Sequence, residues 1–232
     1  MAEQIRERLV RVRERIARAA ERAGRNAEDI TLIAVSKTFD TATVQQAVDA
    51  GARDLGENRV QEAITKVSTV KGDIRWHLIG HLQSNKARKA ASVFEVVHSV
   101  DSAALAARLD EAAAASTRRL DWLIQVDLAG EATKHGASAA DVVTICERAA
   151  SLANARLAGL MILPPAVDNP VQARPYFRAL RELRDELAGR GVDRRMLGQL
   201  SMGMSHDFEV AVEEGATMVR VGTAIFGSRN HV

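Results

Sequence analysis

The feature that most constrains the fold of this chain is a regular alternation of short apolar runs with longer segments of helical composition. The eight apolar runs are rich in Val, Ile and Leu, as expected for parallel strands that are covered on both faces. They span residues 30–35, 52–56, 75–80, 94–100, 121–128, 155–162, 196–202 and 217–222. An alternation of this kind is typical of repeated β/α units.

The segments between these runs complete the pattern. They lie near residues 42–50, 59–70, 84–92, 102–116, 139–152, 170–188 and 206–214, with a short one after Gly222. Eight strands at about 29 residues per unit fit a closed parallel barrel. We therefore predict an α/β fold with one (β/α)8 TIM-type barrel domain over residues 1–232. A doubly wound open sheet is the structural alternative.

The first 25 residues carry eight arginines, which could indicate a nucleic-acid arm or a transit peptide. Their apolar residues favour another interpretation, because Ile5, Leu9, Val12 and Ile16 recur at helical spacing on one stripe. We expect an extra amphipathic N-terminal helix that packs on the barrel.

Charge and composition narrow the class of partner. The 232 residues include 32 basic and 30 acidic side chains, so the net charge of +2 gives no pull toward nucleic acid. The apolar stretch 157–167 is too short and too interrupted by proline to span a membrane. A single cysteine and the absence of a signal-peptide pattern predict a cytoplasmic protein with a small-molecule partner.

In a barrel of this type, the polar residues directly after each strand form the active face. They are Ser36, Lys37, Glu57, Asn58, His81, Ser99, Asp101, Asp127, Ser201 to Ser205, Arg220, Gly222 and Thr223. Lys37 is the most informative, because an ammonium at a barrel mouth is partly removed from water and drawn toward a lower pKa. Such an amine forms imines with carbonyl compounds. A surface lysine that begins a loop is the alternative.

The last strand and the short segment after it predict a phosphate site. Gly222 and Thr223 stand where unpaired backbone N–H groups favour an anion, and Ser201 follows strand seven. Barrels often build a phosphate site from the loops after strands seven and eight. Gly222 as a tight turn and Thr223 as a helix cap are the alternative, and both roles use the same groups.

Three other patterns carry no such chemistry. His77 and His81 stand four apart, but the residues between them indicate a strand and a turn, so we expect no metal site. The consecutive Ser205, His206 and Asp207 are expected to cap the next helix rather than form a hydrolase triad. Cys146 lies mid-helix and is expected to be a buried small apolar residue.

Several segments together carry a resemblance to a known family. They are LIAVSKTF around Lys37, GENRVQEA, WHLIGHLQSNKAR, HSVDS, the glycine after Lys134, and SMGMSHDFEVAVEEGATMVRVGTAIFG. The chain resembles the pyridoxal phosphate homeostasis protein family, whose members are also described as alanine-racemase-like. The resemblance runs from about residue 28 to 229 and covers every β/α unit.

The resemblance implies a fold-type III barrel that holds pyridoxal 5'-phosphate (PLP) as a Schiff base on Lys37. The family's arginine facing the pyridine nitrogen corresponds to Arg220. The other cofactor-binding positions correspond to Ser201, Met204, Ser205, Gly222 and Thr223 around the phosphate, and to Asn58 and His81 on the other side.

The same residues favour binding over catalysis. A guanidinium beside the pyridine nitrogen keeps that nitrogen unprotonated and weakens the ring as an electron sink. The only tyrosine, Tyr176, is expected in a helix far from the barrel mouth, so a second base for racemisation is missing. We therefore expect a non-enzymatic PLP carrier with no catalytic residues, acting in PLP homeostasis as a monomer.

PLP-dependent apo-enzymes would be transient partners of such a carrier, with Lys86 or Lys134 as candidate groups for release of the cofactor. Two alternatives stay open. One is a PLP-dependent amino-acid racemase or related α-carbon enzyme. The other is a barrel enzyme acting on a phosphorylated metabolite, with Lys37 forming an imine to the substrate.

Overall fold

Eight parallel strands close into a barrel in the computed structural model, which describes residues 2–115, 119–130 and 135–227. The strands run in sequence order around the barrel, and β8 pairs with β1. They are β1 (Thr31–Val35), β2 (Asp54–Glu57), β3 (Arg75–Leu78), β4 (Val96–Val100), β5 (Leu120–Val126), β6 (Ala155–Ile162), β7 (Gln199–Met204) and β8 (Met218–Val221). The closure confirms the predicted TIM-type barrel and rules out the open sheet.

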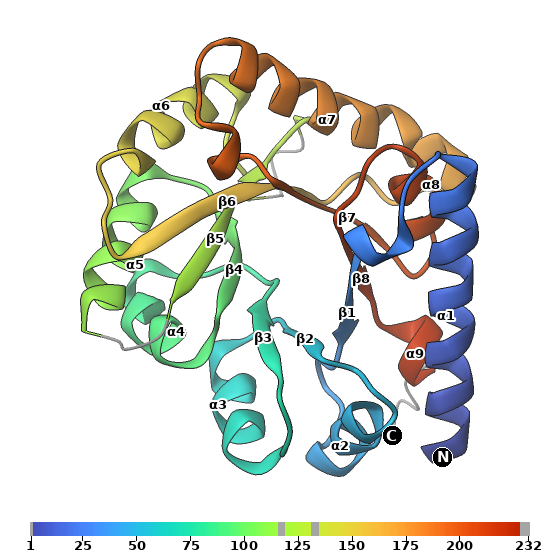
Figure 1. Cartoon of the computed structure of the whole chain (residues 1–232). Coiled ribbons are helices and arrows are strands. Elements are labelled where there is room, and N and C mark those ends of the chain that lie inside the picture. Colours follow the sequence, from blue (N-terminus) through green and yellow to red (C-terminus); the bar gives the residue numbers. More distant parts are fainter. Residues whose placement is uncertain (1, 116–118, 131–134, 228–232) are drawn as a thin grey trace.

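The helices form an outer ring around the strands (Figure 1). The α-helices are α1 (Ala2–Arg22), α2 (Thr41–Asp49), α3 (Val60–Thr69), α4 (Ala87–Val93), α5 (Ala103–Ala114), α6 (Ala139–Ala149), α7 (Arg174–Gly189), α8 (Phe208–Glu213) and α9 (Thr223–Phe226). Short 3₁₀ turns are η1 (Ala27–Asp29), η2 (Ser84–Lys86), η3 (Pro170–Ala173) and η4 (Arg194–Met196). No helix in the described ranges is both long and apolar enough to cross a membrane.

The strands are rich in apolar residues because both of their faces are covered. Every residue of β4 and β5 is buried. One face packs against the helices, while Ile33, Val96, Leu123, Met161 and Met218 form a separate cluster. The barrel interior is therefore a packed core, as in other barrels of this class.

The N-terminal helix is confirmed where the apolar stripe predicted it. Ile5, Leu9, Val12 and Ile16 are buried, and each such side chain contributes about 1.5 to 3 kcal/mol relative to exposure. The helix ends at Arg22, and the chain turns at Gly24, whose φ of 64° suits glycine.

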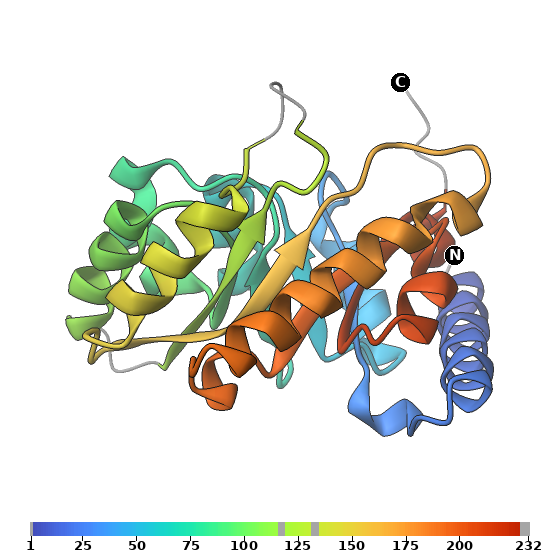
Figure 2. The ribbon, with the colours of Figure 1, turned by 90° about the horizontal axis from the view of Figure 1, so that it is seen from above.

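The arginines of α1 dock this helix on the barrel's last units. Helix α1 packs against α2, α8 and α9, and it lies along the outside of the molecule in both views (Figures 1 and 2). The guanidinium of Arg15 lies 2.7 Å from the Glu209 carboxylate, and that of Arg22 lies 2.8 Å from Glu213. Two of the arginines in this segment therefore form ion pairs to α8.

Strand ends differ from the prediction by a few residues where loops leave the barrel. The expected strand 75–80 ends at Leu78, and Ile79 and Gly80 belong to the lining of a cavity. The expected strand 196–202 begins at Gln199, because Arg194–Met196 form the 3₁₀ turn η4. Apolar side chains in connecting segments extend the apolar run beyond the strand itself.

Candidate functional site

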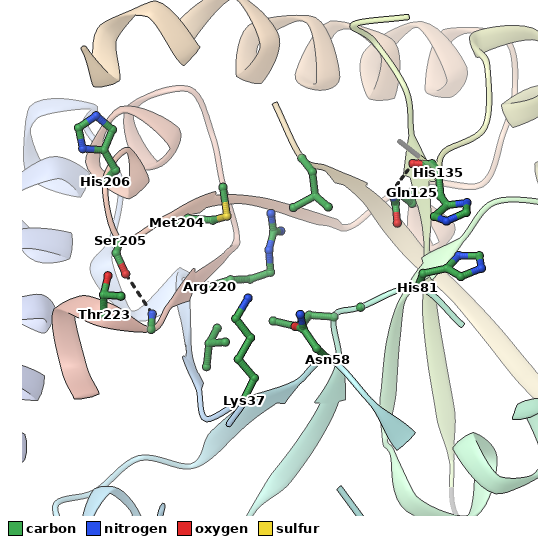
Figure 3. Close-up of a pocket in the computed structure, with 15 residues that line it drawn as sticks. Lys37, Asn58, His81, Gln125, His135, Met204, Ser205, His206, Arg220 and Thr223 are labelled. Carbon is green, nitrogen blue, oxygen red and sulfur yellow. Dashed lines mark hydrogen bonds between the residues drawn. The ribbon is translucent and has the colours of Figure 1, made fainter. Parts of the chain in front are cut away.

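A cavity of about 550 Å³ opens at the carboxyl ends of the strands. It is lined by residues near the carboxyl ends of β1, β5, β7 and β8 and by residues that follow β1, β2, β3, β5, β6, β7 and β8 (Figure 3). The lining consists of Val35, Lys37, Asn58, Ile79, Gly80, His81, Gln125, His135, Leu163, Met204, Ser205, His206, Arg220, Gly222 and Thr223. The structure thus brings together every cofactor-binding position that the resemblance implies except Ser201. Of the other polar residues expected at the strand ends, Ser36, Glu57, Ser99, Asp101 and Asp127 are not part of the lining.

Lys37 extends from the loop after β1 into this cavity (Figure 3). A buried network below it fixes that loop: the Lys66 ammonium donates to the backbone oxygen of Ser36 at 2.8 Å and to Glu57 Oε1 at 2.6 Å. The Ser36 hydroxyl donates to the same Glu57 oxygen at 2.6 Å. Burial raises the pKa of Glu57, while the hydrogen bonds from Lys66 and Ser36 act in the opposite direction.

The residue after Lys37 has an unusual backbone. Thr38 has a φ of 68°, in the left-handed region that a β-branched residue rarely adopts, and its backbone N–H donates to the Glu62 carboxylate at 3.3 Å. Such strain costs about 1 to 3 kcal/mol and is typical of functional sites. The loop that presents the Lys37 amine is therefore held in one conformation by its surroundings.

Arg220 enters the cavity from β8 and is 3% exposed (Figure 3). Its guanidinium donates from Nη1 to the Ser201 hydroxyl at 2.6 Å and from Nη2 to the backbone oxygen of Ile162 at 2.8 Å. Burial lowers the pKa of Arg220 to about 10, with the Asp207 carboxylate opposing the shift. The group stays charged at neutral pH and places a fixed positive charge at the cavity.

Ser205 and the start of α9 form the next part of the wall. The Ser205 hydroxyl accepts the backbone N–H of Gly222 at 3.0 Å and that of Ala224 at 3.4 Å. Thr223 lies beside them (Figure 3). Backbone N–H groups and hydroxyls at one point of a cavity suit a phosphate group.

Ser201 does not take part in this wall. Its side chain is fully buried, and its hydroxyl contacts Arg220 and His98 Nδ1, the latter at 2.8 Å. The chain bends between Ser201 and Met204, because the register with β8 shifts there and Gly203 has a φ of 89°. The bend brings Ser205 to the cavity and leaves Ser201 below it.

The opposite wall is formed by residues from the loops after β2, β3 and β5. The backbones of Gly80 and Asn58 approach closely there, since a Cβ on Gly80 would lie 2.3 Å from the backbone oxygen of Asn58. The Gln125 amide donates to the backbone oxygen of His135. Gln125 and His135 were not predicted: Gln125 lies within a strand, and the sequence before His135 has no apolar periodicity.

His81 and His135 stack on this wall, with ring centroids 3.7 Å apart and planes 13° apart. Burial lowers the pKa of His81, His135 lowers it further, and Asp101 opposes both. His81, Asp101 and His135 each offer a metal-ligand atom within 4.8 Å of the others. Because nitrogen lone pairs lie in the ring planes, nearly parallel rings do not direct them to one point, and we assign no metal to this group.

Residues outside the cavity also have defined places. Tyr176 lies on α7 and packs against the core, away from the cavity lining. Cys146 is buried in α6, as expected. Lys86 belongs to η2 and is not part of the cavity lining, while Lys134 lies outside the described residues.

The fold and the cavity define an alanine-racemase-like barrel, and a family model described as the alanine racemase N-terminal domain matches residues 8–230. The chain is 44% identical over 226 residues to the pyridoxal phosphate homeostasis protein of Aquifex aeolicus, covering 97% of this chain and 98% of that protein. It is 43% identical to the protein of that name from Pseudomonas aeruginosa, covering 87% and 86% of the two chains. This chain belongs to the pyridoxal phosphate homeostasis protein family, which confirms the resemblance found in the sequence.

Solved structures agree with this membership. PipY of Synechococcus elongatus, solved without PLP, superposes with a TM-score of 0.87 at 40% identity, covering 96% of this chain and 100% of that one. The same protein with PLP bound gives a TM-score of 0.84. Alanine racemase of Clostridium difficile gives 0.74 at 18% identity, and the match covers 57% of that chain, so it shows the shared barrel fold alone.

Proposed function

We propose that this protein binds PLP in the cavity and acts as a PLP carrier in cofactor homeostasis, without dedicated catalysis. The observation that carries the proposal is the convergence of an amine, a guanidinium and a group of N–H donors on one cavity, supplied by Lys37, Arg220 and the Gly222 segment. The family membership and the PLP-bound PipY structure support it.

The cavity residues fit this cofactor in size and charge. A volume of about 550 Å³ lies in the range of about 300 to 1,000 Å³ that small ligands occupy. PLP supplies an aldehyde, a pyridine ring and a phosphate. The Lys37 amine would hold the aldehyde as a Schiff base, the Arg220 guanidinium would face the pyridine nitrogen, and Ser205, Gly222 and Thr223 would hold the phosphate.

Binding without turnover is part of the proposal. Arg220 cannot donate a carboxylic proton to the pyridine nitrogen, and a fixed positive charge there disfavours its protonation. The bound ring is then a weak electron sink, and sequestration of a reactive aldehyde is the function that remains. Transfer to apo-enzymes, a monomeric state and a cytoplasmic location belong to the same proposal.

The absorbance spectrum of the purified protein, with and without added PLP, tests the binding. We expect an absorbance band of bound PLP in the wild type and in Lys89→Ala, a matched control at an exposed lysine of α4, and its loss in Lys37→Ala. Borohydride reduction and peptide mapping should place the adduct on Lys37. No band in any of these proteins with excess PLP would refute the proposal.

A second measurement separates the carrier from an enzyme. The PLP-loaded protein is incubated with an amino acid in heavy water, and exchange of the α-proton is followed by NMR. We expect exchange no faster than with free PLP. Exchange at enzymatic rates would contradict the carrier and favour the racemase alternative.

A further inference from the structure

A continuous line of hydrogen bonds crosses the inside of the barrel and ends at Arg220. It runs from Arg220 Nη1 to Ser201 Oγ at 2.6 Å, and from there to His98 Nδ1 at 2.8 Å. His98 Nε2 lies 2.9 Å from His77 Nδ1, and His77 Nε2 lies 2.9 Å from Asp54 Oδ1. The five side chains come from β8, β7, β4, β3 and β2. We call this line the Asp54–Arg220 relay.

The relay connects the cavity with the other end of the barrel. Asp54 is the first residue of β2, at the end opposite the cavity, and its side chain is 22% exposed. His77, His98 and Ser201 are completely buried. Solvent therefore reaches the relay at the Asp54 carboxylate, while Arg220 faces the ligand cavity at the other end.

The two ends of the relay determine where every hydrogen lies. A guanidinium only donates hydrogen bonds, and a carboxylate only accepts them. Ser201 must then donate to His98 Nδ1, His98 Nε2 must donate to His77 Nδ1, and His77 Nε2 must donate to Asp54. This arrangement requires two neutral rings, each with its hydrogen on Nε2.

The opposite direction would leave a group unsatisfied. His98 would then donate to Ser201, which already accepts from Arg220. The Ser201 hydrogen would have no acceptor among the contacts found in the described part of the chain. Because an unsatisfied buried hydroxyl costs about 1 to 3 kcal/mol, and the Asp54 carboxylate can only accept from His77 Nε2, the two ends together impose the direction. Burial also lowers the pKa values of His77 and His98, in agreement with neutral rings.

The relay compensates a buried charge that lacks a carboxylate in direct contact. In the described ranges, the hydrogen-bond acceptors of the Arg220 guanidinium are a hydroxyl and a backbone oxygen. A buried charge is costly unless it is paired and hydrogen-bonded. The aligned dipoles of Ser201, His98 and His77 carry the influence of the Asp54 carboxylate to Arg220, and chains of this kind strengthen their members.

We propose that Asp54, His77, His98 and Ser201 are positioning residues that hold the Arg220 guanidinium in place and set its effect on the pyridine-type ring of a ligand in the cavity. This inference rests on the proposed PLP binding for its ligand. The hydrogen-bond relay itself consists of side chains of the protein and does not involve the ligand.

The first test uses the protein without PLP. Long-range ¹H–¹⁵N NMR of the imidazole rings reports which nitrogen carries the hydrogen. We expect both His77 and His98 as neutral Nε2–H tautomers at neutral pH. An Nδ1–H tautomer or a charged ring at either residue would overturn the relay. This result does not depend on ligand binding or on any substitution.

The second test uses the PLP-loaded protein and Asp54→Asn, which keeps an oxygen acceptor for His77 and removes the charge. Loss of a distant negative charge disfavours the protonated, positively charged form of bound PLP. The pH midpoint of the PLP absorbance band should therefore fall by about half a unit. Ser201→Ala breaks the relay next to Arg220 and should shift the midpoint further. PLP affinity in Asp54→Asn should stay within about twofold of the wild type, because the phosphate contacts are intact.

Thr217→Val is the matched control. It removes a hydroxyl that bridges Gln199 and the Leu200 backbone next to β7 and β8, outside the relay. We expect lower stability and an unchanged midpoint, which separates structural damage from the relay's effect. Unchanged midpoints in both Asp54→Asn and Ser201→Ala would overturn the proposal. No PLP band in the wild type would instead refute the proposed function, and the tautomers would decide the relay by themselves.

Discussion

The Lys66 ammonium and the Glu57 carboxylate form a buried ion pair at 2.6 Å, directly beneath the loop that carries Lys37. Both side chains are almost fully shielded from solvent, and Glu57 Oε1 accepts from Ser36 as well. A buried pair of this kind is costly to break on one side only, because the remaining charge has no partner.

Lys66→Met should therefore destabilise the protein by about 3 to 5 kcal/mol. The double variant Lys66→Met/Glu57→Gln should recover much of this loss, because it removes both charges together. Urea unfolding of the wild type, the two single variants and the double variant measures the coupling. A loss below about 1 kcal/mol in Lys66→Met would show that the pair does not stabilise the loop.

Ser205→Ala should weaken PLP binding by about tenfold, which corresponds to one hydrogen bond to a charged group. The hydroxyl lies beside the N–H groups of Gly222 and Ala224, where the phosphate is proposed to bind. Pyridoxal, which lacks the phosphate, is the control ligand and should bind both proteins equally. Equal losses for the two ligands in equilibrium titrations would place the phosphate elsewhere.

The buried histidines should make the fold sensitive to mild acid. Burial lowers the pKa of His77 against the opposing effect of Asp54, and it lowers that of His98 together with the nearby His77 and Arg220. In the unfolded chain both rings take up a proton as the pH falls through about 6.5, whereas the folded protein resists this. The unfolded state then binds more protons, so stability is present above that pH and is lost below it.

Between about pH 7.5 and pH 5.5, the free energy of unfolding should fall by up to about 1.4 kcal/mol per histidine. Denaturant unfolding at the two pH values measures this change. His98→Gln, compared with the wild type, should show a smaller loss over the same range. An identical pH dependence in the two proteins would mean that His98 is not the source.

Cys146 should resist alkylation as long as the protein is folded. Burial raises the pKa of its thiol to about 11, with a further contribution from Glu147, so little thiolate is present at neutral pH. Iodoacetamide labelling followed by mass spectrometry should be slow in buffer and fast in urea. Labelling of the native protein at the rate of glutathione would contradict the buried position.

The barrel could be predicted from the sequence because its strands are covered on both faces and therefore show as apolar runs. Lys37 and Asn58 could be predicted as cavity residues since each lies within two residues of the end of such a run. The position of Ser201 below the cavity could not be predicted, because the register shift in β7 interrupts the alternation of its side chains. The contact between His77 and His98 could not be predicted from the sequence either, since contacts inside a barrel depend on the stagger of its strands.

The seam between β1 and β8 joins the first strand of the barrel to its last. Lys37 stands at one side of this seam, and Arg220, Gly222 and Thr223 stand at the other, so the cavity exists only after the ring has closed. During synthesis Lys37 is made early, whereas Arg220, Gly222 and Thr223 are added only after the first seven strands of the barrel. Closure over so long a loop is slow, and a ligand that binds only the closed ring favours it by mass action. Retention of a small molecule at this cavity would thus distinguish finished copies from nascent ones.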